Sequence, residues 1–298
     1  MINFKKPEIT DKPWIDELCK AENSRSADYS FGNIFMWDSR YHQKVARIGD
    51  RLAILLNYDT TPFFAFPVGS GELRDAIRSL QDYAAAEGFP FRMRGVTAEH
   101  ATALRELFPD EYQYTEDRAY YDYIYSAEKL ASLSGKKLHG KRNHINRFVE
   151  DYPDWSFVPL TTALIPECNE MLDSWTLLNQ DELERGLRPE HDALMCGFEN
   201  YETLGLEGGA LYTGGRMVAF TIGERISTDT YNMHFEKAFA DIQGAYPMVN
   251  REFVRLTLER YPEIRYINRE DDMGHENLRR AKLSYRPEFL IEKYIVGA

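Results

Sequence analysis

The chain has 298 residues, of which 43% are hydrophobic and 28% charged, and its formal net charge is −12. This length favours two domains over one, and the apolar content is sufficient for two hydrophobic cores. An acidic chain is a poor sequence-independent binder of nucleic acid, because phosphate groups repel it. We therefore expect no DNA partner, and any RNA contact should be confined to a small patch.

Several broad protein classes are disfavoured by the sequence. No apolar run reaches the roughly 20 residues that a membrane-spanning helix needs, and the N-terminus MINFKKPEIT lacks the apolar core of a signal peptide. The three cysteines are widely spaced, and the histidines show no HxH or HExxH spacing. These features predict a cytoplasmic protein with no stable membrane insertion, no disulfide framework, no metal and no redox cofactor.

In the first half of the chain, predicted strands alternate with predicted helices. The expected strands are residues 2–4, two strands within 44–59, then 63–68, 91–96 and 120–126. The expected helices are one that begins near Asp11, then 31–41, 71–88 and 98–108.

A similar order begins again after Pro153. Expected strands are residues 156–160, three strands within 208–239, then 264–270 and 288–296, and expected helices are 166–180, 191–205, 246–261 and 275–285. The segment DELERG, residues 181–186, predicts a charged surface loop or a lid. We therefore expect two domains, residues 1–153 and 154–298, each a mixed β-sheet flanked by helices.

A single basic segment interrupts this acidic chain. Residues 129–149 contain six Lys or Arg and no Asp or Glu. A helix beginning near Gly135 would place Lys136 and Lys137 in its first turn, where each cation opposes the helix dipole by about 0.3–1 kcal/mol. An anion bound by Lys136, Lys137, Lys141 and Arg142 would explain this arrangement. The alternative is a solvated helix face.

Three segments of the chain resemble a known family. They are DYIYSAEKLASLSGKKLHGKRNHINRF (residues 122–148), EKAFADIQGAYPMVNREF (236–253) and DDMGHENLRRAKLSYRPEF (271–289). Together they resemble an uncharacterised bacterial family of tandem-GNAT proteins, related to the C-terminal synthase domain of lysyl- and alanyl-phosphatidylglycerol synthases and distantly to the Fem transferases. The resemblance covers essentially the whole chain, and LRRAKLSYRP is similar to the ending Leu-Arg-x-x-Lys-x-x-aromatic-x-Pro of the lipid synthases.

The resemblance implies two tandem GNAT-like domains and transfer of an aminoacyl group from a charged tRNA. The lipid synthases carry a membrane half that this sequence lacks, which argues against a lipid acceptor. GNAT enzymes that use CoA grip its pyrophosphate with backbone amides of a glycine-rich turn. The corresponding segment here, ADIQGAYP, offers only Gly244 and is followed by Pro247, so we expect weak CoA binding.

The candidate catalytic residues lie in the second half of the chain. Arg279 and Lys282 are three apart and share a helix face, and the resemblance places them near the transfer site; the alternative is a surface helix. Tyr285 falls where GNAT enzymes often keep a tyrosine that protonates the leaving group, although it is alternatively a packing residue.

A second set of candidates lies on strand TYNMHFEKA. Alternation puts Asn232, His234 and Glu236 on one face. Several GNAT enzymes place the base that deprotonates an amine on this strand, which makes Glu236 the candidate base. The alternative is a hydrogen-bonded polar face. The acids near Arg269 cap the last helix or, alternatively, bind a substrate ammonium.

These observations predict an acyl- or aminoacyltransferase that uses an anionic donor, with an amine or hydroxyl as the acceptor. A tRNA acceptor end is the expected partner. In this hypothesis Arg279 and Lys282 polarise the acyl carbonyl, Glu236 is the base, and the basic helix with Gly244 holds phosphates. The alternatives are a CoA-thioester-dependent N-acyltransferase and a non-catalytic binding protein.

Overall fold

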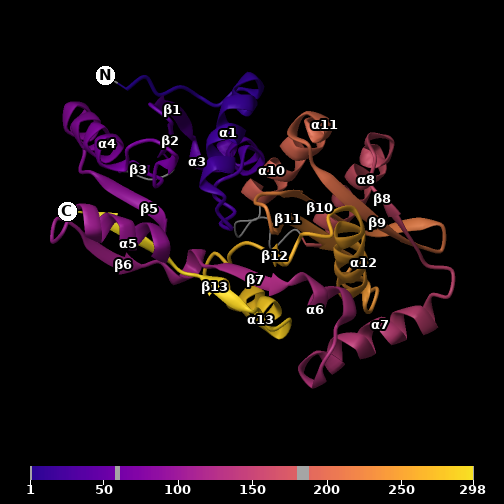
Figure 1. Ribbon diagram of the computed structural model, residues 1–298. Coiled ribbons are helices and arrows are strands. Elements are labelled where there is room, and N and C mark those ends of the chain that lie inside the picture. Colours follow the sequence, from indigo (N-terminus) through magenta and orange to yellow (C-terminus); the bar gives the residue numbers. More distant parts are fainter. Residues whose placement is uncertain (1, 58–60, 180–187, 298) are drawn as a thin grey trace. The chain divides into compact units, whose positions relative to one another are not determined.

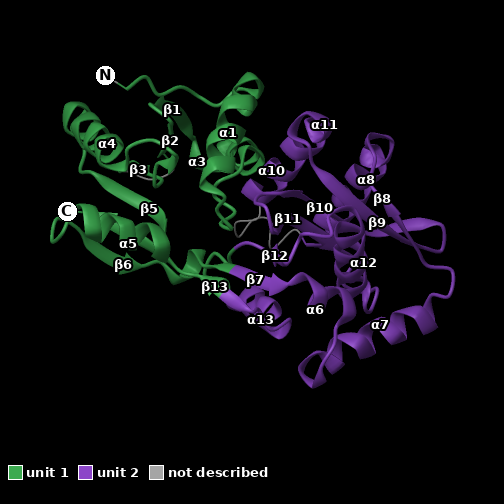
Figure 2. Cartoon of the chain, viewed as in Figure 1, with its two compact units in different colours: residues 1–122, 271–275, 290–298 green, residues 123–270, 276–289 purple. Residues whose placement is uncertain are grey.

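The computed structural model describes residues 2–57, 61–179 and 188–297 (Figure 1). The chain forms two compact units, drawn in different colours in Figure 2. Unit 1 contains residues 1–122, 271–275 and 290–298, and unit 2 contains residues 123–270 and 276–289. The charged loop expected at residues 181–186 lies outside the described residues.

Unit 1 is built on a sheet with the strand order β1-β2-β3-β5-β14-β6, and β4 pairs with β2 beside this path. β3 and β5 run parallel, whereas β14 is antiparallel to both of its neighbours, so the sheet is mixed. The strands are β1 Lys44–Ile48, β2 Arg51–Leu56, β3 Phe63–Phe64, β4 Val68–Gly69, β5 Arg92–Thr97, β6 Gln113–Glu116 and β14 Lys293–Gly297. The α-helices are α1 Lys12–Glu22, α2 Phe31–Met36, α3 Asp38–Tyr41, α4 Leu73–Glu87 and α5 Ala98–Leu107, and the 3-10 helices are Ile9–Asp11 and Arg118–Tyr120.

Unit 2 contains the second sheet, in the order β13-β7-β12-β11-β10-β9-β8. β11 and β12 are parallel, and β12 is antiparallel to β7. The strands are β7 Asp122–Ser126, β8 Ser156–Pro159, β9 Glu207–Thr213, β10 Arg216–Arg225, β11 Thr230–Ala238, β12 Tyr266–Asn268 and β13 Phe289–Ile291. The α-helices are α6 Ala127–Ser132, α7 His139–Asp151, α8 Ile165–Leu178, α10 Arg188–Glu199, α11 Tyr201–Leu204, α12 Ala245–Arg260 and α13 Glu276–Ser284, and the 3-10 helices are Lys136–Leu138 and Thr162–Leu164.

Helical periodicity accounts for the buried residues of the amphipathic helices. On α4, Ile77, Leu80 and Ala84 are buried at helical spacing. On the basic helix, Ile145 and Phe148 are buried while the polar positions between them are exposed. Burial of one apolar face is what holds such helices against the rest of the fold.

The two units divide the chain differently from the expected junction at residues 153 and 154. Strand β7 precedes that junction but pairs with β12 in unit 2, and the last strand, β14, pairs with β5 and β6 in unit 1. The basic helix α7 also belongs to unit 2. Strand pairing across long sequence separations, rather than the order of elements, therefore sets the boundary.

A buried lysine explains how β14 is held in unit 1. Lys293 is 1% exposed, and its Nζ lies 2.8 Å from Asp122 Oδ1 and 2.8 Å from Asp28 Oδ2. Burial lowers the pKa of Lys293, but the Asp122 and Asp28 carboxylates more than offset this, and the net shift is upward. A buried charge of this kind is stable only with its partners, so three distant segments of unit 1 are tied together.

Some local predictions need correction. Residues 2–4 do not form a strand, and only a single bridge joins Lys5 to Val45. The helix expected at residues 31–41 is two short helices, α2 and α3, and the strand expected at 288–296 is β13 and β14 with a break at Glu292. The basic helix begins as a 3-10 turn at Lys136, and its α-helical part starts at His139.

No helix in the described ranges is both long and apolar enough to cross a bilayer. Among the residues that the structure describes, no group of three or more His, Cys, Asp or Glu side chains is arranged to hold a metal ion.

Candidate functional site

The candidate site lies in unit 2, where two parallel strands part. Pairing between β11 and β12 ends at Asn232 and Asn268, although β11 continues to Ala238. Beyond that point the two segments are no longer paired through their backbones, and both carry polar side chains. They are His234 and Glu236 on β11, and Arg269 and Glu270 directly after β12.

An ion pair joins the two strands beyond their last backbone pairing. Arg269 Nη2 donates to Glu236 Oε1 at 3.0 Å, and Asn250 Nδ2 of α12 donates to Glu236 Oε2 at 2.9 Å. Arg269 Nη1 and Asn250 Oδ1 are buried without a hydrogen-bond partner among the described residues. Because buried polar groups are normally paired, one donor and one acceptor beside Glu236 remain available to a ligand.

Aromatic rings surround the arginine. Its Cζ lies 4.7 Å from the centroid of the Tyr285 ring and 5.8 Å from that of Tyr125. Burial lowers the pKa of Arg269, but Glu236 more than offsets this and the pKa is raised. Burial raises the pKa of Tyr285. Arg269 is therefore a permanent cation, and Tyr285 keeps its proton at neutral pH.

A lysine of the basic helix reaches the same cluster. Lys141 Nζ lies 3.8 Å from the centroid of the Tyr285 ring. Burial, and then repulsion from Arg269, lower the pKa of Lys141 from 10.5 to about 8. The cluster thus contains two cations, Lys141 and Arg269, and one carboxylate, Glu236. We call Lys141, Glu236, Asn250, Arg269 and Tyr285 the Arg269 cluster.

Lys282 and Arg279 are placed differently by the structure. Lys282 Nζ donates to the backbone carbonyl of Arg269 at 2.5 Å, and the Lys282 carbonyl accepts from the Tyr125 hydroxyl at 2.8 Å. Lys282 therefore fixes the backbone that carries Arg269. Arg279 lies one turn earlier on α13 and is partly exposed.

The remaining basic residues do not act as one group. Lys136 and Lys137 are exposed. Arg142 Nη1 donates to the carbonyls of Leu133 and Gly135, so this arginine closes the turn that precedes α7. Of the four predicted anion-binding residues, the structure brings only Lys141 to the candidate catalytic residues.

Gly244 has a packing role. It is the N-cap of α12 with φ +92°, and a Cβ there would lie 2.5 Å from the His144 carbonyl oxygen and 2.8 Å from Phe148 Cβ. The next amide, that of Ala245, already donates to the Ile242 carbonyl at 3.1 Å, and Pro247 has no N–H. The turn therefore presents few free amides, which does not fit the way a GNAT turn grips CoA.

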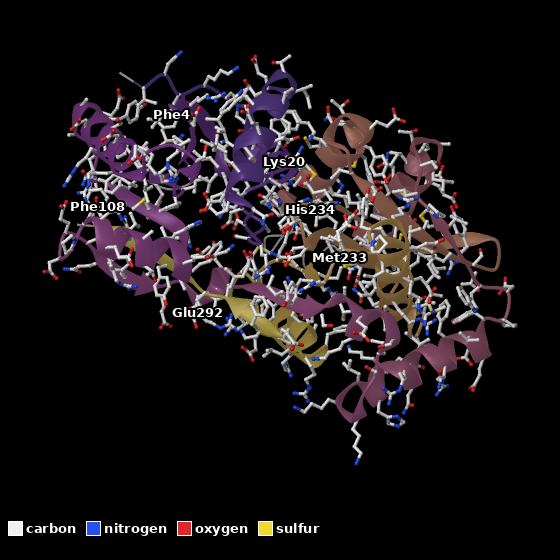
Figure 3. The ribbon with its side chains drawn as sticks, viewed as in Figure 1. Phe4, Lys20, Phe108, Met233, His234 and Glu292 are labelled. Carbon is white, nitrogen blue, oxygen red and sulfur yellow. The ribbon has the colours of Figure 1, made fainter. Side chains whose placement is uncertain are left out.

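A second polar cluster lies two residues earlier on β11, around His234, which Figure 3 labels beside Met233. His234 Nδ1 lies 2.8 Å from Glu270 Oε1, and its Nε2 lies 3.0 Å from Glu224 Oε1. Asn232 Nδ2 also donates to Glu270 Oε1, at 2.8 Å. Burial lowers the pKa of His234, but hydrogen bonds to Glu224 and Glu270 more than offset this and raise it to about 9. We call Glu224, Asn232, His234 and Glu270 the His234 cluster.

Sequence reasoning did not predict that Arg269 and Asn250 contact Glu236. In the sequence Arg269 stands out only as a neighbour of acidic residues, and Asn250 lies on α12 with no motif around it. A polar residue on the buried face of an apolar helix was the available signal for Asn250, which is 0% exposed. Nothing local in the sequence connects it with Glu236.

Comparison with known proteins places this geometry in a family. A family described as phosphatidylglycerol lysyltransferase, C-terminal, matches residues 20–297. A conserved protein of unknown function from Bacteroides thetaiotaomicron is 40% identical and has a TM-score of 0.94, with 100% of this chain and 99% of that chain covered.

Other similar proteins are more distant in sequence. The structure of L-PGS from Bacillus licheniformis has a TM-score of 0.68 at 15% identity, covering 100% of this chain and 93% of that chain. An uncharacterized protein of Mycoplasmoides gallisepticum is 25% identical over 182 residues, which are 59% of this chain and 55% of that protein. This chain thus spans about half the length of that relative.

The likeness to L-PGS and the two mixed sheets confirm the expected tandem GNAT-like fold. The match over residues 20–297 covers nearly the whole chain. The protein therefore belongs to the family of the phosphatidylglycerol lysyltransferase C-terminal domain.

Proposed function

We propose that this protein is an acyl- or aminoacyltransferase that takes the acyl group from an anionic donor of the aminoacyl-tRNA kind and passes it to an amine or hydroxyl. The family description names a lysyl transfer, and the resemblance noted from the sequence implies a charged tRNA as donor. The observation that carries the proposal is the buried, unpartnered Nη1 of Arg269 beside the Glu236 carboxylate. That pair supplies a donor for a developing oxyanion and a base within one cluster.

The residues of the Arg269 cluster suit the steps of such a transfer. The acceptor's amine or hydroxyl attacks the acyl carbonyl and gives its proton to Glu236. Negative charge develops on the carbonyl oxygen, where Arg269 Nη1 and Lys141 stabilise it. The ester bond then breaks as the new bond to the acceptor is completed. The leaving hydroxyl oxygen takes a proton from Tyr285. The proton held by Glu236 then replaces it on Tyr285 by way of solvent, so that both side chains end in their starting protonation states.

The charge balance of the cluster also supports an anionic donor. Two cations face one carboxylate, so a phosphate brought by the donor, or the oxyanion that forms at the acyl carbonyl, compensates the excess positive charge. The alternative donor, a CoA thioester, is disfavoured because the turn at Gly244 packs against α7 and has few free amides. A non-catalytic binding protein would need the same ligand but no base, so variants of Glu236 separate the two hypotheses.

The test is transfer from tRNA charged with a mixture of labelled amino acids, offered with primary amines or with vesicles that contain phosphatidylglycerol. We expect the parent protein to speed loss of label from tRNA and its appearance on one acceptor class. Glu236→Gln should lower this rate by about 100-fold or more, the usual contribution of a general base. Glu259→Gln, an exposed position on α12, makes the same charge change and should transfer like the parent.

Three results would contradict the proposal. One is equal transfer by the parent and Glu236→Gln. Another is low-micromolar acetyl-CoA binding by calorimetry together with acetyl transfer, which would favour the CoA-dependent alternative. The third is tight binding of charged tRNA with no transfer to any acceptor, which would favour the binding protein.

A further inference from the structure

We propose that the His234 cluster is a recognition site for a primary ammonium group carried by a substrate. The inference deepens the proposed function, because the ammonium would belong either to the acyl group or to an amine acceptor at the adjoining Arg269 cluster. The argument rests on the geometry of the four side chains of the His234 cluster.

The hydrogen bonds of His234 define the charge of the cluster. Both ring nitrogens lie within 3.0 Å of carboxylate oxygens, Nδ1 on Glu270 and Nε2 on Glu224. Asn232 Nδ2 also lies 3.0 Å from Nδ1, but the Glu270 oxygen is closer to that nitrogen. Because carboxylates accept hydrogen bonds, contact with a carboxylate at both nitrogens favours a ring that donates from both, which is an imidazolium. One positive charge between two negative charges leaves the cluster with a net charge of −1.

Several acceptors in the cluster remain unused. Asn232 is 0% exposed, and its Nδ2 is bonded to Glu270 Oε1 while its Oδ1 is buried without a partner in the described part of the chain. The described hydrogen bonds of Glu224 and Glu270 use Oε1 of each side chain and leave Oε2. An ammonium group has three donors and no acceptor, which matches a buried amide oxygen flanked by two carboxylate oxygens.

The backbone holds these acceptors in fixed positions. Asn232 lies in register with Glu224 on β10 and with Asn268 on β12, so three polar residues form one row across the sheet. The backbone amide of Glu270 donates to Asn268 Oδ1 at 2.6 Å, and Glu270 has φ +56°. A left-handed conformation is uncommon for a non-glycine residue, and this turn directs the Glu270 side chain to Asn232 and His234.

The cluster adjoins the proposed transfer site. His234 and Glu236 are two residues apart on β11, which is a spacing of about 7 Å along a strand. A positively charged subsite around Arg269 and a negatively charged subsite around His234 thus follow one another along β11. A ligand with an ammonium group near an acyl ester, or an amine that approaches that ester, complements both.

Calorimetry with two probes at pH 7 tests the assignment. L-lysinamide represents the acyl group, and cadaverine represents an amine acceptor without a carbonyl. We expect at least one probe to bind the parent, and its Kd to rise tenfold or more in Glu270→Gln and in Glu224→Gln. Glu259→Gln is the control for the charge change. Binding of lysinamide alone assigns the site to the acyl group, and binding of cadaverine alone assigns it to the acceptor.

A measurement on the parent protein covers the case in which these variants fail to fold. With ¹⁵N-labelled histidine, the ring nitrogen signals of His234 should shift when a binding probe is added. The inference is overturned if neither probe binds, if both Glu variants bind like the parent, or if a probe binds while the His234 signals stay in place. Because these experiments need no turnover, absence of acyl transfer would count against the proposed function alone.

Discussion

Lys141 Nζ lies over the ring of Tyr285, 3.8 Å from its centroid, and no carboxylate forms an ion pair with it in the described residues. Its ammonium is half-buried beside Arg269, which explains its lowered pKa. A cation in this position costs folding free energy in the absence of an anionic ligand. The stability of the protein should reveal that cost.

Lys141→Met should stabilise the free protein at neutral pH. The folded-state pKa of about 8 lies below the usual 10.5, so the cost of the charge is fully present below pH 8 and vanishes as pH rises to 10.5. We expect the unfolding free energy to increase by about 1–3 kcal/mol at pH 7 and by little at pH 10.5. Urea unfolding at both values measures this, with the exposed Lys136→Met as the control. A less stable Lys141→Met protein at pH 7 would contradict it.

His234 should make stability fall in the alkaline range. Its pKa is raised from 6.5 to about 9 in the folded state, so its contribution is complete below pH 6.5 and is lost as pH rises through 9. The difference in unfolding free energy between the parent and His234→Gln should shrink by up to about 3 kcal/mol over that range. Denaturant unfolding from pH 6 to 9.5 tests this, and a constant difference would show that the ring is not charged.

Two glycines near the basic helix should respond in opposite ways to alanine. Gly244→Ala places a methyl group against the His144 carbonyl at positive φ, and we expect a loss of about 1–3 kcal/mol. Gly140→Ala on α7 meets nothing within 4 Å and should add about 0.5–1 kcal/mol through helix propensity. Thermal or urea unfolding of both variants gives the comparison. Equal stability of Gly244→Ala and the parent would mean that α7 does not pack against α12 as described.

The basic segment should separate into binding and structural residues. Lys136→Gln with Lys137→Gln removes exposed charges, so stability should be unchanged while tRNA affinity falls. The salt slope should fall by about 0.7 for each single-strand phosphate that the protein no longer neutralises. Arg142→Met removes the hydrogen bonds to two carbonyls and should cost about 1–2 kcal/mol of unfolding free energy. Unchanged tRNA binding and salt dependence in the double variant would mean that these lysines are only a solvated surface.

The sequence alone predicted most helices and strands, because each shows a local repeat of apolar residues that is typical of its type. Burial of one helix face requires apolar residues at positions such as Ile77 and Leu80, and alternation on β11 requires Asn232, His234 and Glu236 to share a face. Three residues that the sequence singled out lie together in the structure: Glu236 and Tyr285 both contact Arg269, and Lys141 contacts Tyr285. Their roles in binding or catalysis stay predictions.

Only the tertiary structure decided which strands pair and which polar groups meet. Backbone hydrogen bonds between strands are the same for every residue type, so no local pattern shows that β14 joins β5 or that β7 joins β12. The contact between Arg269 and Glu236 depends on where the pairing of β11 with β12 ends. The packing role of Gly244 depends on the carbonyl of His144, which lies 100 residues earlier in the chain. Such contacts depend on the path of the backbone in space. The composition of a segment and the spacing of its apolar residues do not determine that path.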